Sequence, residues 1–276
     1  MDSKIILLGT GGDSTVVGKQ LRGSGGIILI AEGYQFHIDP GPGALVRCRQ
    51  FNINPRDNTA VIATHNHLNH AAGLNEVISA MTHNGLDKKG IVISNNTVIN
   101  GDEGYEPLLN RFYKNCVERF IAVKVGQRVG INSIELRAIK AFHSEPNTFG
   151  LKFFTPKFTL SYSSDTRYSP ELIEEYRDSS ILILNSVYPF GTKDRDLLNL
   201  DDCVRIIRDV KPKLSVLTHF GIKMLNADPL YVSREVQKQT GVEVVSAKDG
   251  MMINPVNYSA HLTQKTLNLY PTSKDQ

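Results

Sequence analysis

The stretch Val61-Ile62-Ala63-Thr64-His65-Asn66-His67-Leu68-Asn69-His70 begins as a β-branched, apolar run and ends with three histidines in six residues. Its first four residues have the composition of a buried β-strand. Residues 71–78, which follow, have the pattern of the first turns of a helix, although Gly73 weakens that pattern. The sequence therefore predicts that the histidines lie on a loop between a strand and a helix.

The spacing of the three histidines allows their side chains to converge. In an extended segment His65 and His67 share one side, and the turn into the helix can bring His70 round to meet them. Neutral imidazole is the commonest metal ligand in proteins, and three imidazoles at this spacing can form most of a zinc coordination shell. For this stretch alone, a set of helix-capping or solvated loop histidines is the alternative. Residues farther along the chain favour the metal site.

Four other positions complete a pattern. Asp39 stands in Ile-Asp-Pro-Gly-Pro-Gly, and His143, Asp165 and His219 each follow a strand-like run. Together with the histidine stretch, these residues resemble the five motifs of the metallo-β-lactamase-fold hydrolases, in order and over nearly the whole chain. The family signature T-H-x-H-x-D-H is changed at one place, where Asn69 replaces the aspartate. A single motif can arise by chance, whereas five in order at strand ends do not.

The resemblance implies a metal centre. A first ion would be bound by His65, His67 and His143, and Asp165 would bridge it to a second ion. Asp39 would brace the metal loop without binding metal. The shell of the second ion would be completed by three residues: Asn69, His70 and His219. Zinc is expected, as one or two ions, because imidazoles with one carboxylate suit it; manganese and iron are the alternatives.

The candidate catalytic residues are Asp165 and Asn69, next to a metal-bound hydroxide that would attack the substrate. An amide oxygen is a much poorer ligand for a dication than a carboxylate, and asparagine cannot accept the proton that aspartate accepts in many relatives. Three hypotheses follow. The first metal position is filled preferentially, or a dinuclear centre turns over slowly, or the protein is an inactive, metal-bound ligand sensor. The retained His70 and His219 favour an active centre.

The beginning of the chain and the segment after Asp39 bear on the substrate. Leu8-Gly9-Thr10-Gly11 and Asp-Pro-Gly-Pro-Gly are most similar to the phosphodiesterase and tRNA 3′-processing branches of the family. Only 22 positions separate His143 from Asp165, too few for the tRNA-binding arm that the tRNA enzymes insert there. A metal-dependent phosphodiesterase for a small or cyclic phosphodiester is therefore predicted. Hydrolysis of a lactone, thioester or lactam is the alternative.

The resemblance implies an α/β fold, a four-layer αββα sandwich with two mixed sheets packed face to face and helices outside. Hydrophobic patterning predicts helices at residues 44–51, 71–81, 106–117, 170–177, 198–210 and 229–239. It predicts strands at residues 4–8, 27–30, 34–39, 61–64, 91–94, 133–142, 149–153, 158–162, 181–184, 214–217, 242–245 and 251–253. One domain is expected over residues 1–254, and a tail or arm over 255–276.

The composition of the chain narrows the classes of binding partner that we expect. No apolar run approaches the roughly 20 residues that cross a bilayer, so no membrane partner is expected. The net charge of +3 is small and the basic residues are dispersed, which argues against a nucleic-acid partner. A small-molecule substrate is expected, and a homodimer is compatible with the sequence.

The remaining histidines and the cysteines are given structural roles. His37 is expected to be an ordinary strand residue and His83 an exposed residue at a helix end. The three cysteines, Cys48, Cys116 and Cys203, are few and far apart. They suit buried free thiols in a reducing compartment, so the cytoplasm is the expected location.

Overall fold

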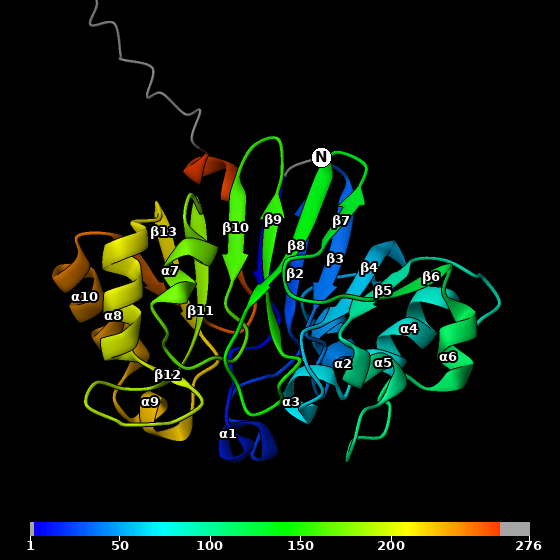
Figure 1. Ribbon diagram of the computed structural model, residues 1–276, viewed down its shortest axis with the longest axis horizontal. Coiled ribbons are helices and arrows are strands. Elements are labelled where there is room, and N and C mark those ends of the chain that lie inside the picture. The colour runs from blue at the N-terminus through cyan, green and yellow to red at the C-terminus, as the bar shows by residue number, and fades with distance from the viewer. Residues whose placement is uncertain (1–2, 260–276) are drawn as a thin grey trace, which may run out of the picture.

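A computed structural model describes residues 3–259, which form a four-layer sandwich (Figure 1). Two mixed β-sheets pack face to face in the middle, and helices cover the outer face of each sheet. The structure confirms the fold class that the sequence predicts. At the end of the sandwich opposite the N-terminus, the strands give way to loops and short helices.

Seven strands form the first sheet: β1 (Lys4–Leu7), β2 (Ile27–Ala31), β3 (Tyr34–Ile38), β4 (Asn58–Ala63), β5 (Ile91–Ser94), β6 (Arg119–Ala122) and β15 (Met251–Ile253). Their spatial order is β15-β1-β2-β3-β4-β5-β6. The pairs from β15 to β3 are antiparallel, and those from β3 to β6 are parallel.

Eight strands form the second sheet: β7 (Arg128–Ile131), β8 (Ile134–Lys140), β9 (Phe149–Phe154), β10 (Thr159–Tyr162), β11 (Ile181–Tyr188), β12 (Leu198–Asn199), β13 (Leu214–Thr218) and β14 (Glu243–Ser246). The order is β14-β13-β11-β10-β9-β8-β7, and β12 pairs with β11. The pairs from β14 to β10 are parallel and those from β10 to β7 antiparallel, so each sheet has one parallel and one antiparallel half.

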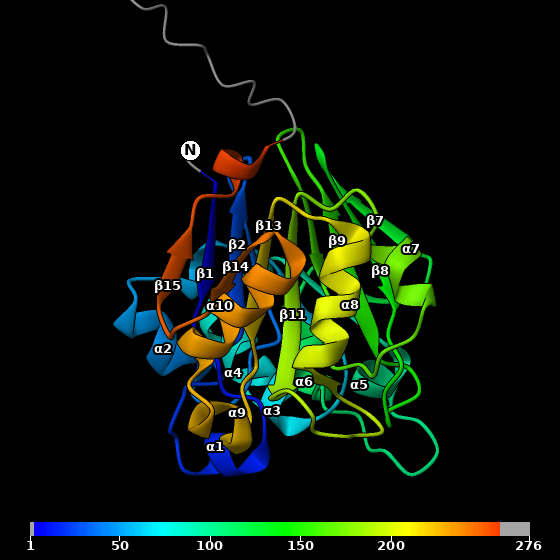
Figure 2. The same ribbon diagram turned by 90° about the vertical axis from the view of Figure 1, so that its left-hand side faces the viewer.

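Helices flank both sheets. Those nearest the first sheet are α2 (Ala44–Gln50), α4 (Leu74–Thr82), α5 (Asn96–Asn100) and α6 (Arg111–Cys116). Those on the second sheet are α7 (Glu171–Tyr176), α8 (Leu200–Val210) and α10 (Pro229–Thr240), and Figure 2 shows α8 and α10 in front of β11 and β13. The short helices α1 (Ser14–Gly18), α3 (Leu68–Ala71) and α9 (Ile222–Asn226) lie at the loop-lined end.

The largest hydrophobic core lies between the two sheets. Side chains alternate along each strand, so Ile62 of β4 points into this core while Val61 packs with the outer helices. The rings of Phe36 and Phe153 meet edge to face across the sheets, with centroids 5.4 Å apart. Both residues are fully buried. The packed interior makes the two sheets a rigid support for the loops at their ends.

The helix predicted over residues 106–117 is wrong in its first half, because α6 begins only at Arg111. Pro107 lacks a backbone N–H and restricts the residue before it. Leu109 donates its N–H to the carbonyl of Val98 instead of to a helical turn. The Asn110 side chain then accepts a hydrogen bond from Phe112 N and starts the helix.

The helix predicted over residues 198–210 begins at Leu200, because Asn199 and Asp202 form a capping box and Leu198 pairs in β12. Of the predicted tail, the segment Pro255–Tyr258 forms a short 3-10 helix, and residues 260–276 lie outside the described residues. None of the helices within residues 3–259 has the length and apolar character needed to span a membrane.

Candidate metal centre

The histidine stretch follows β4, as the sequence predicts. Asn66 stands between His65 and His67 on the segment that leaves the strand. His70 lies in α3, a single helical turn, and not on a loop. His65 and His70 are buried, and His67 is partly exposed. The helical turn places His70 beside His65, with ring centroids 4.2 Å apart.

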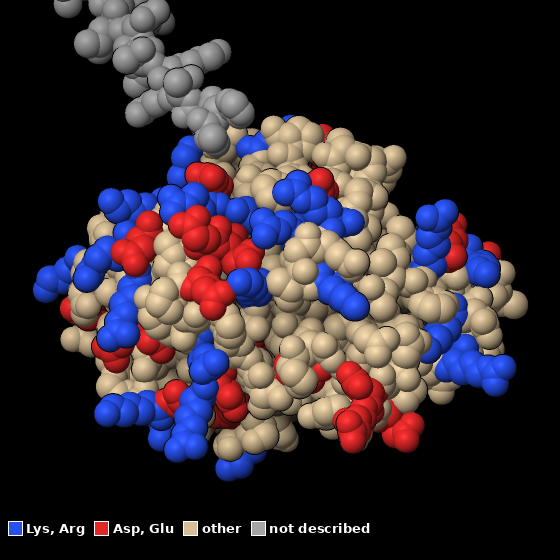
Figure 3. Space-filling view, in the orientation of Figure 1, with Lys and Arg blue, Asp and Glu red and all other residues tan. Residues whose placement is uncertain are grey.

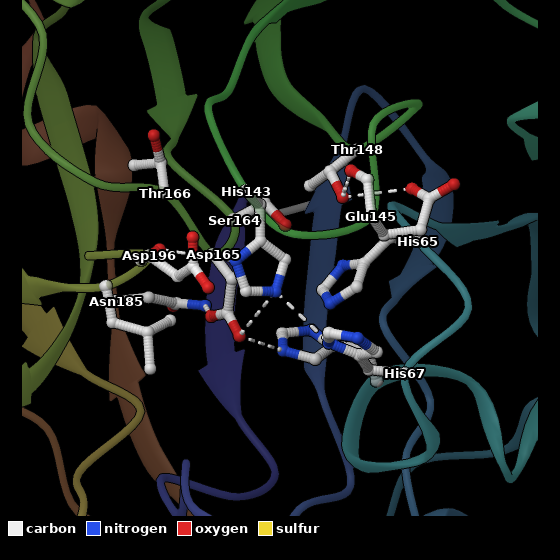
Figure 4. A network of polar contacts seen from close by, with 12 residues as sticks. His65, His67, His143, Glu145, Thr148, Ser164, Asp165, Thr166, Asn185 and Asp196 are labelled. Atoms are coloured by element: carbon white, nitrogen blue, oxygen red, sulfur yellow. Dashed lines mark hydrogen bonds and ion pairs between the residues drawn. The ribbon is translucent and has the colours of Figure 1, made fainter. Parts of the chain in front are cut away.

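Four of the predicted residues form a first cluster. His67 Nδ1 lies 3.1 Å from His143 Nε2, and His143 Nε2 lies 4.0 Å from Asp165 Oδ2. One nitrogen or oxygen atom from each of these residues and from His65 lies within 4.8 Å of the others. In Figure 4 the side chains of His65, His67, His143 and Asp165 point toward a common place.

The tautomer of His65 fits a metal ligand. Thr64 Oγ1 lies 2.9 Å from Asp39 Oδ2, a carboxylate that only accepts, so the Thr64 hydroxyl proton goes to Asp39. Thr64 Oγ1 must then accept a hydrogen bond from His65 Nδ1, which is 3.1 Å away. The proton on Nδ1 leaves a lone pair on His65 Nε2, which is buried and has no protein hydrogen-bond partner. A cation in the cluster would satisfy that atom.

A second cluster shares Asp165 with the first. His70 Nε2 lies 3.2 Å from Asp165 Oδ2, His219 Nε2 lies 3.3 Å from Asp165 Oδ1, and the two Nε2 atoms are 3.2 Å apart. His70 Nδ1 lies 2.9 Å from Asp39 Oδ2 and donates to it. This hydrogen bond turns His70 Nε2 toward the cluster. Asp39 therefore contacts the histidine stretch through Thr64 and His70, and its role in supporting bound metal stays a prediction.

The electrostatics of the two clusters favour a cation. Burial lowers the pKa of His65 well below its ordinary value, and nearby His70 lowers it further, so His65 is neutral. Burial opposes a charge on His70, but Asp165 and Asp39 outweigh it and raise the pKa of His70 to about 10. Burial likewise opposes a charge on Asp165, but His219 and His70 hold its pKa well below the ordinary value. A buried carboxylate among imidazoles is a donor set that suits a divalent metal.

Three backbone positions at the site are strained. Asp39, Ser164 and His219 have φ values of 50°, 55° and 62°, in the left-handed region that non-glycine residues rarely adopt. Each follows the end of a strand closely: β3, β10 and β13 respectively. Such conformations cost roughly 1 kcal/mol or more each and persist where the surrounding structure enforces them. They lie at, or one residue before, three side chains of the site: Asp39, Asp165 and His219.

Asn69 is held by a hydrogen bond that the sequence does not reveal. Its Nδ2 donates to the carbonyl of Gly12 at 2.9 Å and lies 3.2 Å from His219 Nε2. Gly41, in the segment after Asp39, packs so closely on Asn69 that an added Cβ would come within 2.2 Å of its carbonyl oxygen. The roles of Asn69 in metal binding and catalysis remain predictions.

The sequence analysis missed Asn185. This residue lies in β11, and its Nδ2 donates to Asp165 Oδ1 at 2.7 Å and to the hydroxyl of Tyr162 at 3.2 Å. Tyr162 donates in turn to Asp39 Oδ2 at 2.9 Å. The available signal was an asparagine within the apolar run Ile181–Tyr188, where a buried amide needs polar partners.

Glu145 was also missed. It is buried on the loop that carries His143, and it accepts hydrogen bonds from Asn95, Thr97 and Thr148. Figure 4 shows Glu145 with Thr148. The bonds from Asn95 and Thr97 join the His143 loop to the beginning of α5, whose N-cap is Asn95. Glu145 thereby fixes the loop from which His143 reaches the first cluster.

The other histidines and the cysteines lie outside both clusters. His37 is fully buried in β3, with Nε2 2.8 Å from the carbonyl of Gly25. His83 lies at the exposed end of α4. The three cysteines, Cys48, Cys116 and Cys203, are buried and free. These positions agree with the structural roles expected for them.

A sequence profile described as "Beta-lactamase superfamily domain" matches residues 34–220, which include the histidine stretch, His143, Asp165 and His219. The chain belongs to the β-lactamase superfamily. The match confirms the resemblance found in the sequence. This family comprises metal-dependent hydrolases, and the two clusters give the present member a place to hold a divalent metal.

Known proteins resemble the chain over nearly its full length. An uncharacterized protein of Methanocaldococcus jannaschii, MJ1374, is 28% identical over 259 residues, which cover 93% of this chain and 97% of that protein. The metallo-β-lactamase-fold protein YhfI from Bacillus subtilis superposes with a TM-score of 0.77 at 18% identity, covering 92% of this chain and 99% of YhfI.

Two further solved structures share the fold. A diphosphatase of the PhnP family has a TM-score of 0.69 at 18% identity, covering 91% of this chain and 97% of its own. The short form of human tRNase Z has a TM-score of 0.65 at 15% identity, covering 91% and 98%. At these identities the likeness establishes the fold of this chain and leaves its substrate open.

Proposed function

We propose that this protein is a metal-dependent phosphodiesterase that hydrolyses a small or cyclic phosphodiester. The observation that carries the proposal is Asp165, whose two carboxylate oxygens each face an imidazole of the second cluster while one also faces His143 of the first. Zinc is the metal we expect, because five imidazoles surround a single carboxylate. Divalent cations held there would polarise a phosphoryl oxygen and activate a water at neutral pH.

The side chains of the protein would position the metal and the substrate. Asp39 fixes the imidazole of His70, and Asn185 fixes the carboxylate of Asp165. Both interactions are buried, so these groups are oriented before any substrate arrives. The centre lies at the end of the sandwich where loops and short helices surround it, and His67 of the first cluster is partly exposed there.

The choice of a phosphodiester rests on resemblance and on size. The beginning of the chain and the segment after Asp39 resemble the phosphodiesterase branch, and one structural neighbour is named as a diphosphatase. Of the 21 residues between His143 and Asp165, ten form the strands β9 and β10, which leaves too few for a protruding arm there. Basic and acidic side chains are interspersed on the face shown in Figure 3. The short segment between His143 and Asp165 and the mixed surface charges both support a small substrate over a tRNA.

A substrate panel tests the proposal. Zinc-loaded protein should hydrolyse bis(p-nitrophenyl) phosphate, with little action on a lactone or a chromogenic lactam. Chelation should abolish the activity and added zinc should restore it. His67→Ala should also lose it, whereas His83→Ala, which changes an exposed histidine outside both clusters, should keep it.

Two results would overturn the assignment. Preferential turnover of the lactone or lactam would assign the protein to carboxylic hydrolysis. Absence of all turnover in a protein with its full metal content would favour a ligand sensor. The sensor is the second candidate because the neutral Asn69 cannot accept a proton as an aspartate would.

A further inference from the structure

The orientation of the Asn69 amide is fixed by its surroundings. The Gly12 carbonyl can only accept hydrogen bonds, and Asn69 Nδ2 lies 2.9 Å from it. The reversed amide would place two carbonyl oxygens at that distance, losing a hydrogen bond and adding repulsion. The hydrogen-bond network therefore assigns the NH2 group of Asn69 to the side that faces His219 Nε2, 3.2 Å away.

Gly12 has no freedom to move away from Asn69. Its N–H donates to the carbonyl of Phe220 at 3.0 Å, and Phe220 N donates to Thr10 O at 2.7 Å. A Cβ added at Gly12 would come within 2.2 Å of the carbonyl oxygen of His219. The loop after β1 and the segment after β13 are thus packed directly on each other, and Asn69 joins both.

The two metal positions consequently differ in ligands. The first cluster offers three imidazole nitrogens and the Asp165 carboxylate. The second cluster offers two imidazoles and the same carboxylate, and the Asn69 atom that lies 3.2 Å from His219 Nε2 is an amide nitrogen whose lone pair is not available to a metal. Among the described residues, Asp165 is the one carboxylate that belongs to either cluster, so a second dication would share with the first a single carboxylate positioned to bind metal.

We propose that Asn69 is a positioning residue and not a metal ligand: its amide ties the Gly12 carbonyl to the His219 side of the centre, and the two metal positions fill stepwise. The first cluster fills first, and the second binds its ion with roughly tenfold to hundredfold lower affinity, the range found when one supporting group of a metal site is lost. The inference rests on the proposed metal centre but not on the proposed substrate.

Zinc binding without substrate tests this inference. Metal-stripped protein is equilibrated by dialysis against increasing free zinc, and bound zinc is measured by elemental analysis. The wild type should bind two ions in two separate steps. His219→Ala should lose the weaker step and keep the stronger one. Asn69→Asp should strengthen the weaker step at least about tenfold, because a carboxylate can ligate there.

Thermal unfolding supplies a second readout. Without metal, Asn69→Asp should lower the Tm, because a carboxylate oxygen would then face the Gly12 carbonyl; zinc should raise the Tm of this variant more than that of the wild type. Asn75→Asp is the matched control. Asn75 Nδ2 also donates to a backbone carbonyl, that of Leu108 at 2.8 Å, but it lies in α4 outside the clusters. This variant should lower the Tm and leave both zinc steps unchanged.

The inference would be overturned if wild-type protein bound two zinc ions with equal affinity. It would also be overturned if Asn69→Asp bound the second ion no more tightly than the wild type. If Asn69→Asp fails to fold, the His219→Ala titration still decides the order of filling, because loss of the stronger step would contradict it. Failure of phosphodiester hydrolysis alone would leave these binding results intact and would count against the proposed substrate only.

Discussion

Asp39 Oδ2 accepts a hydrogen bond from His70 Nδ1 at 2.9 Å, and neither side chain is more than 4% exposed. The same carboxylate also accepts from the backbone and hydroxyl of Thr64 and from Tyr162. One buried carboxylate thus holds β3, β4 and β10 together at the place where the metal centre is built. Because this carboxylate can only accept, it keeps a proton on His70 Nδ1 and directs His70 Nε2 toward the cluster, where it could bind a metal.

Replacing Asp39 with asparagine should weaken metal binding about tenfold to a hundredfold, because an amide presents N–H groups to donors that need an acceptor. The free energy of unfolding should fall by roughly 1–3 kcal/mol. Zinc dialysis and urea unfolding measure the two effects. Asp57→Asn is the control: its carboxylate accepts one exposed hydrogen bond, from Asn54, and the change should cost less than about 0.5 kcal/mol. Equal effects from both variants would contradict the role given to Asp39.

Asn185→Ala should lower metal affinity by a similar factor, although Asn185 itself ligates nothing. The substitution removes the hydrogen bond that orients Asp165 and leaves Tyr162 OH with one partner fewer. Spectra of the cobalt-substituted protein report the ligand geometry and should change as well. A variant with unaltered spectrum and affinity would show that Asp165 is oriented without Asn185.

Removal of the metal should destabilise the protein. Zinc that binds only the folded state contributes about 2.7 kcal/mol when its free concentration is one hundred times its Kd. Dialysis against a chelator should therefore lower the Tm, and zinc should restore it. Calcium at the same concentration should not, because calcium selects oxygen ligands and this centre is mainly imidazole. Restoration by calcium as effective as by zinc would argue against an imidazole site.

The buried His37 predicts a loss of stability in acid. Burial lowers its pKa from 6.5 to about 4, against the opposing effects of the Gly25 hydrogen bond and of Asp39. In the unfolded chain the imidazole takes up a proton below about pH 6.5, whereas the folded protein excludes that proton until about pH 4. The stabilisation is therefore complete above pH 6.5 and is lost progressively as the pH falls to 4.

His37→Gln should abolish that part of the acid loss while keeping a donor for Gly25. Between pH 7 and pH 5 the wild type should lose about 2 kcal/mol more unfolding free energy than the variant. Urea unfolding in the presence of a chelator measures this difference without a contribution from bound metal. Equal losses in the two proteins would show that His37 does not stay neutral in the folded state.

Several features of the fold and the site followed from local patterns. The runs that become β2, β3, β5, β9 and β11 bury nearly all their residues. Such strands can be recognised in a sequence from their apolar composition or from their alternation of apolar and polar residues. The helix beginnings were harder to place, because Asn110 and Asn199 set them through side-chain caps that outweigh the apolar pattern. Glu145 and Asn185 were missed because, apart from Thr148, the partners named above lie between 20 and 50 positions away.

The sequence by itself determined the set of candidate metal-binding side chains and the strands that they follow, because imidazoles at strand ends are a local pattern with a chemical meaning. Only the tertiary structure decided how those side chains face one another. The amide of Asn69 takes its direction from Gly12, 57 positions away, and the tautomer of His70 from Asp39, 31 positions away. Hydrogen bonds between distant segments exist only after the sheets have packed, so no local pattern contains them.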